Sequence, residues 1–72
     1  MEEKLLDLIN KYLNKEIDFE KFENYRIPLE EYIKDEEEKD LYDSFYIAVG
    51  MAHESGEKEL KYTLKYWKGL LE

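Results

Sequence analysis

The stretch 35–52 limits the possible folds of this chain more than any other feature, because its apolar residues recur at helical spacing. Five of them form one stripe at about 100° per residue: Leu41, Phe45, Ala48, Val49 and Ala52. Ile47 and Met51 lie well off that stripe, so the helix has apolar surface on two sides and only a narrow strip for water. The pattern predicts a central helix that neighbours cover on both sides.

Three further segments have helical periodicity, at 2–13, from about Phe19 to a stop imposed by Pro28, and at 57–71. Proline cannot donate a backbone hydrogen bond, so the second helix should be kinked or split there, with Pro28 opening a new helical turn. Apolar residues nowhere alternate as a strand requires. We therefore expect one all-α domain over residues 1–72, a small antiparallel four-helix bundle.

Local sequence also predicts where the helices begin and end. Asp18 should cap the second helix, and Asp35 should cap the third with Glu38 three residues on. The acidic run that starts at Asp35 fits either a helix start or a helix interior, and we favour a break at Asp35. Gly56 should follow the end of the long helix. In the last helix Trp67 shares its stripe with leucines and should be buried.

Composition narrows the possible partners. The 72 residues include no cysteine and one histidine, so helix packing alone must stabilise the domain. The formal charge of −8 argues against nucleic acid or an anionic membrane as a direct ligand and favours a basic partner. The first residues are acidic where a signal peptide needs basic ones, and no apolar run is long enough to span a membrane. We expect a cytoplasmic protein.

The densest charged segment runs from residue 30 to residue 43, where two lysines reduce the net charge to −6. It contains eight acidic residues: Glu30, Glu31, Asp35, Glu36, Glu37, Glu38, Asp40 and Asp43. Such a run is often only a solvated helix start. Here tyrosines Tyr32, Tyr42 and Tyr46 lie among or beside the acids, a mixture typical of protein interfaces. These eleven residues form the predicted partner-binding face.

No catalytic or metal site is expected. Read as a calcium loop from Asp35, the segment has Asp40 where glycine is required and Tyr46 where a bidentate glutamate is required. His53 has Gly50 three residues before it, which excludes the Glu-x-x-His pair of a di-iron bundle. We therefore predict no cofactor, no metal and no enzymatic activity.

With these residues in view, the chain resembles the colicin D immunity family, bacterial self-protective proteins that form small acidic helical bundles. The opening LLDLINKYLNKEIDFEKFENY is similar to the family's apolar first helix, polar turn and capped second helix with its Phe22-Glu23 pair. The end, EKELKYTLKYWKGLLE, is similar to the family's last helix. The resemblance implies inhibition of a tRNA-cleaving nuclease toxin by covering its basic active site, and it assigns no individual contact residue.

Three classes of function stay open on the sequence. The first is a toxin immunity protein. The second is another acidic inhibitor or nucleic-acid mimic, such as a phage-encoded antagonist of host defence. The third is a structural or adaptor bundle whose charge only keeps it in solution. The acidic face itself is compatible with all three.

Self-association is a further alternative, so we expect a monomer or a weak homodimer. A dimer could form through the third helix, or through Tyr62 and Tyr66, which lie one turn apart beside Gly69. Gly50 inside a helix costs about 1 kcal/mol relative to alanine, so it should mark a close helix crossing or a point where a partner approaches.

Overall fold

The computed structural model describes all 72 residues, and 85% of them are helical. The elements are α1 (Glu2–Leu13), α2 (Phe19–Arg26), a 3₁₀ helix η1 (Ile27–Tyr32), α3 (Glu36–Ser55) and α4 (Glu57–Leu71). There is no strand. The expected helical segments are all present, and the expected break before Glu36 is confirmed.

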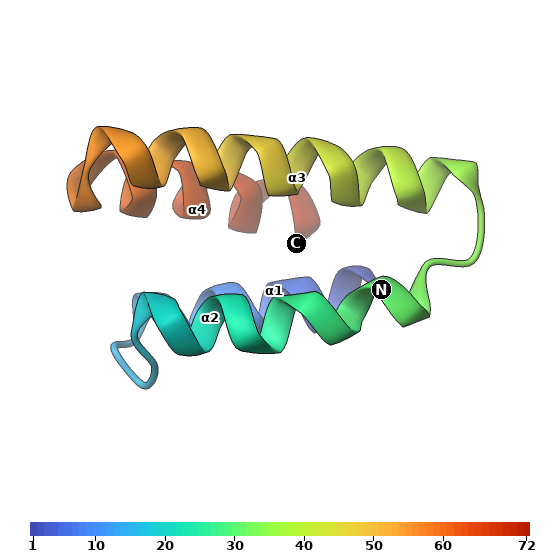
Figure 1. Cartoon of the computed structure of the whole chain (residues 1–72), viewed down its shortest axis with the longest axis horizontal. Helices are drawn as coiled ribbons and strands as arrows, with labels where there is room; N and C mark the ends of the chain where they lie inside the picture. The colour runs from blue at the N-terminus through green and yellow to red at the C-terminus, as the bar shows by residue number, and fades with distance from the viewer.

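The helices form two layers in a body of 32 × 21 × 20 Å. Figure 1 shows α3 and α4 as an antiparallel pair in one layer and α1 with α2 in the other, with α2 and η1 lying under α3. Helix α4 packs against both α3 and α1. The predicted antiparallel four-helix bundle is therefore confirmed.

One core joins all four α-helices. Its twelve buried residues are Leu5, Leu8, Ile9, Tyr12, Phe22, Tyr42, Phe45, Val49, Ala52, Leu60, Leu64 and Trp67. Trp67 is 9% exposed, as its stripe predicted, and its ring meets that of Phe45 edge to face with centroids 5.4 Å apart. Phe45 also meets Phe22 of α2 with ring centroids 6.3 Å apart, so aromatic contacts join α3 and α4 to the layer below.

Side-chain caps fix two of the helix starts. The Asp18 carboxylate accepts a hydrogen bond from Lys21 N at 2.9 Å, and the Asp35 carboxylate accepts one from Glu38 N at 2.9 Å. The Glu38 carboxylate accepts a hydrogen bond from Lys34 N. In a standard capping box it would instead accept one from the N–H of the cap residue, Asp35. Hydrogen bonds to Lys34 N and to Glu38 N, on either side of Asp35, therefore fix the acidic turn.

Pro28 divides the second helical segment as predicted. Helix α2 ends at Arg26, and Pro28 lies in the first turn of η1. None of the six residues of η1 is fully buried, although Leu29 packs against the core. The split therefore gives a short segment that lies over the core without entering it, and Ile33 and Lys34 then lead into α3.

Helix α3 is not the fully covered central helix that its sequence suggested. Ile47 is 58% exposed and Met51 is 66% exposed, because helical spacing turns both about 100° or more from Tyr46, whose ring meets Arg26 of α2. Gly56 ends α3 with a positive φ of 116°, a conformation that favours glycine. No helix combines the length and apolar character that a bilayer crossing requires.

Candidate functional site

The acidic residues gather at the end of the bundle where α1 and α3 begin (Figure 1). Glu2 of α1 lies with Asp35, Glu37 and Glu38 around a shallow hollow of about 400 Å³. Glu2 was not among the predicted site residues, because only the fold brings the first helical residue beside the start of α3. We call Glu2 and the eight acidic residues between positions 30 and 43 the acidic end.

No carboxylate between residues 30 and 43 is neutralised by an ion pair. The four ion pairs of the chain join Asp7 to Lys11, Glu23 to Arg26, Glu57 to Lys61 and Glu72 to Lys68. Lys34 and Lys39 do not pair with any of the neighbouring acids. Ion pairs within the chain therefore do not neutralise these carboxylates.

The predicted acidic residues do not share one flat face. Glu30 and Asp43 line a second shallow hollow of about 400 Å³, between η1 and α3, together with Lys39. Helical spacing turns Glu36 and Asp40 toward the outer side of α3, whereas Glu37 lines the hollow beside Glu2. Glu31 is exposed on η1. The residues of the acidic end therefore point in several directions from η1 and the first half of α3.

Tyr42 does not belong to a contact surface, which corrects the sequence interpretation. Its side chain is 2% exposed and forms part of the core. Its hydroxyl accepts a hydrogen bond from Arg26 Nη1 at 2.7 Å and lies 3.4 Å from a Glu30 carboxylate oxygen. Burial raises the pKa of Tyr42 above its ordinary value. Tyr42 is a structural residue beneath the acidic end.

Arg26 is the buried cation that organises this region, and sequence reasoning missed it. The residue is 4% exposed, and its Nε donates to Glu23 at 3.0 Å. Burial works to lower the pKa of Arg26, but the hydrogen bond and charge of Glu23 outweigh it, so the pKa lies above its ordinary value. The sequence signal was available, because this is the one arginine in a lysine-rich chain, in the last turn of a capped helix.

Two predicted tyrosines are accessible, and each is held by a cation. Tyr46 is 50% exposed, and the Arg26 guanidinium lies 4.3 Å from its ring centroid. Tyr32 is 47% exposed, with Lys4 Nζ 4.4 Å from its ring centroid. Both rings therefore border the acids while their positions are fixed from one side.

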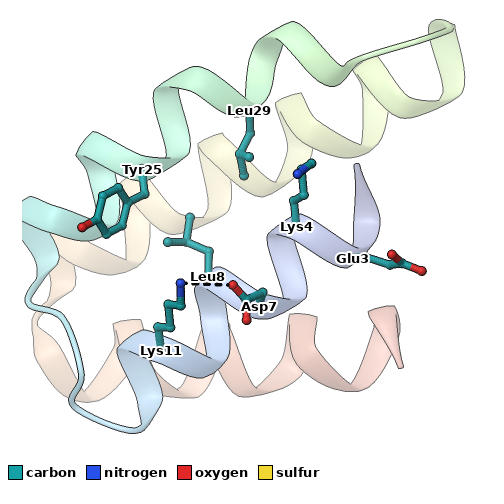
Figure 2. A pocket seen from close by; sticks show the side chains of 7 residues that line it. All are labelled: Glu3, Lys4, Asp7, Leu8, Lys11, Tyr25 and Leu29. Atoms are coloured by element: carbon teal, nitrogen blue, oxygen red, sulfur yellow. Dashed lines mark ion pairs between the residues drawn. The ribbon is translucent and has the colours of Figure 1, made fainter.

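Another hollow, of about 320 Å³, lies between α1 and the α2–η1 segment (Figure 2). Leu8, Leu29 and Tyr25 line it, and the Asp7–Lys11 pair, at 3.3 Å, crosses its rim. Lys4 and Glu3 add one charge of each sign. The balanced rim selects for neither cations nor anions, so this hollow is a weaker candidate than the acidic end.

The histidine takes part in packing at the opposite end. Its ring stacks on Phe19 with centroids 3.9 Å apart and an interplanar angle of 5°. No three His, Asp or Glu side chains converge as metal ligands anywhere in the chain.

Comparison of the chain with protein-family models, with curated proteins and with solved structures finds no match in any of the three.

Proposed function

We propose that this protein is a non-catalytic inhibitor that binds a basic protein, most specifically a nuclease-type toxin, through its acidic end. The observation that carries the proposal is the absence of any ion pair on the eight carboxylates between residues 30 and 43. The resemblance to colicin D immunity proteins supports the same class of partner. The source would then be a bacterium, with the protein acting in the cytoplasm.

The physical basis is charge complementarity. A nuclease active site is basic because it must hold phosphates, so the acidic end imitates the charge of the substrate. Unpaired carboxylates steer such a partner over roughly one Debye length, about 8 Å at physiological salt. Steering raises the association rate more than it raises the affinity, so the proposed interaction should be strongly salt-dependent.

Tyr46 and Tyr32 supply the apolar part of the proposed contact. Tyrosine is enriched among the residues that dominate binding energy, because it buries a large ring at a low entropic cost. Arg26 already holds the Tyr46 ring from one side, so little further ordering is needed when a partner covers the other. Truncation of Tyr46 to alanine should therefore raise the dissociation rate and leave the association rate nearly unchanged.

The experiment is co-expression with the product of a neighbouring gene or capture from the native host, followed by a tRNA or DNA cleavage assay with and without this protein. The key variant is Glu36→Lys/Glu37→Lys, which reverses two exposed charges in the first turn of α3. Glu38 is left unchanged because it accepts the Lys34 N–H that holds the turn. We expect at least a tenfold slower association and a shallower salt dependence.

The matched control is Glu16→Lys/Glu20→Lys, which makes the same change in net charge at the opposite end, one substitution again lying in the first turn of a helix. This control should associate at close to the parental rate. Equal effects of the two double variants would mean that only net charge matters and would reject the acidic end as the contact. Protection of no nuclease would reject the toxin partner.

A further inference from the structure

A second surface lies on the outer side of the α3–α4 pair, next to the acidic end. It consists of five exposed apolar side chains: Ile47 (58%), Met51 (66%), Tyr62 (70%), Tyr66 (61%) and Leu70 (59%). Those on α3 are spaced i and i+4, and those on α4 are spaced i, i+4 and i+8. Each helix therefore contributes a continuous apolar stripe.

The two stripes face away from the rest of the molecule. On α3, the side toward α2 and η1 is marked by Tyr46, which contacts Arg26, and helical spacing turns Ile47 and Met51 about 100° or more from it. On α4, the side toward α1 is marked by Lys61, which lies near Tyr12. Leu70 lies on the far side of α4 from Lys61. Since α3 and α4 lie side by side, the stripes form one outer face (Figure 1).

Two glycines at this face have no packing role within the chain. Gly69 lies one turn from Tyr66, and Gly50 lies at the edge of the face, one turn from both Ile47 and Tyr46. Both are inside helices. A Cβ added to either would meet nothing within 4 Å, so neither serves a close contact between helices of the bundle. The sequence allowed two roles for Gly50, a close helix crossing or a point where a partner approaches, and the structure excludes a close crossing within the bundle. Glycine weakens a helix interior, and close approach of another chain would account for both.

The accessible area of the face approaches what a dimer needs. At about 150–250 Å² for each large side chain, the five at these exposures leave roughly 470–790 Å² accessible. A standard stable interface buries about 800 Å² per partner. The upper part of this range exceeds the about 300–600 Å² typical of the largest patch on a monomer.

Charge around the face fits a second copy of the same chain. On α3 the exposed charges around the stripe are acidic, Glu36, Asp40, Asp43 and Glu54. On α4 the outer edge carries Lys58 and Lys65, and Glu59 lies within the stripe. A two-fold axis parallel to the helices places α3 of one copy over α4 of the other, so the acidic rim of each copy meets the basic rim of its partner. The alternative axis would place acidic rim against acidic rim.

We propose that the outer face of the α3–α4 pair binds the same face of a second copy of this chain, forming a symmetric dimer. Light scattering or sedimentation over the micromolar range should give a mass of twice 8.8 kDa. A mass of 8.8 kDa throughout that range would overturn the proposal.

A matched pair of variants locates the interface. Ile47→Gln lies in the face, whereas Ile27→Gln changes an isoleucine of similar exposure, 55%, on η1. The first should weaken the dimer at least tenfold, and the second should leave the mass unchanged. Equal loss in both would indicate non-specific association. A monomeric parent whose Ile47→Gln variant loses capture of a basic partner would assign the face to that partner and overturn the dimer.

Substituting the two glycines tests separately whether they matter for the dimer or only for folding of the monomer. Gly50→Ala and Gly69→Ala should each raise the ratio of folded to unfolded monomer about fivefold, because alanine is the better helix former and space is available. The same substitutions should weaken the dimer, because a methyl group separates the two copies. Variants that stabilise the monomer and leave the dimer equally tight would exclude a close crossing at these glycines.

Discussion

Removing the hydroxyl of Tyr42 should destabilise the fold far more than its small size suggests. In Tyr42→Phe the ring still fills the core, but Arg26 Nη1 loses the acceptor that it contacts at 2.7 Å. Arg26 is only 4% exposed, so water cannot replace that oxygen without rearrangement. A hydrogen bond to a charged group contributes about 1.5–3 kcal/mol, and we expect a loss of that size. For a domain of this length it corresponds to a melting temperature lower by roughly 6–24 °C.

The assay is urea unfolding followed by the fluorescence of Trp67, the only tryptophan, at a protein concentration low enough to keep the chain monomeric. Tyr62→Phe is the control, because its hydroxyl belongs to a side chain that is 70% exposed, and it should change stability by less than about 0.5 kcal/mol. A Tyr42→Phe variant as stable as this control would refute the assignment of Arg26 and Tyr42 as a coupled buried pair.

A double-mutant cycle separates the pair from its parts. Arg26→Met alone should leave the Tyr42 hydroxyl buried without its donor, whereas Arg26→Met with Tyr42→Phe replaces both polar groups by apolar ones. The double variant should therefore cost about 0.5–3 kcal/mol less than the two single variants added together. Strict additivity would mean that the hydrogen bond contributes nothing to folding.

Three further predictions concern the core, the caps and alkaline pH. Trp67→Ala should cost about 3–5 kcal/mol, enough to unfold so small a domain, and circular dichroism that keeps the parental melt would contradict its burial. Asp35→Ala should cost about 1 kcal/mol by removing the bond to Glu38 N, and Asp35→Asn should restore most of it; equal melts of both would exclude a cap. Burial raises the pKa of Tyr42, and burial with the charge of Glu57 raises that of Tyr12, so the folded state retains protons that the unfolded state releases above about pH 10. Stability should fall as pH rises through that range, and less steeply in Tyr42→Phe.

The fold could be read from the sequence because each helix has its own local signals. Asp18, Asp35 and Gly56 mark helix ends through backbone chemistry that acts over a few residues, and the structure places these ends where the sequence did. The stripe of α3 that includes Phe45 and the stripe of α4 that includes Trp67 each follow from helical spacing alone. Such signals need no knowledge of the partners in space.

The candidate site could be read less well, because it depends on which helices become neighbours. Tyr42 lies among acids in the sequence, yet its position on α3 turns it to the buried Arg26. Glu2 joins the acidic end only because α1 begins beside α3. Periodicity showed that Ile47 lies off the core stripe, but it could not tell whether α2 would cover it. Each error concerns contacts between distant segments.

The packing of α1 against α4 joins the first helix of the described chain to the last. Helices α3 and α4 are connected by a single turn and can meet soon after each forms, whereas α1 must find α4 across all the intervening residues. Loop closure over that distance costs little extra stability, about 0.6 kcal/mol for each doubling of length, but it slows folding. We therefore expect α3 and α4 to pair first and α1 to dock late. A circular permutant that links the two ends and opens the turn at residues 14–18 would make the same contact local and should fold faster into the same core.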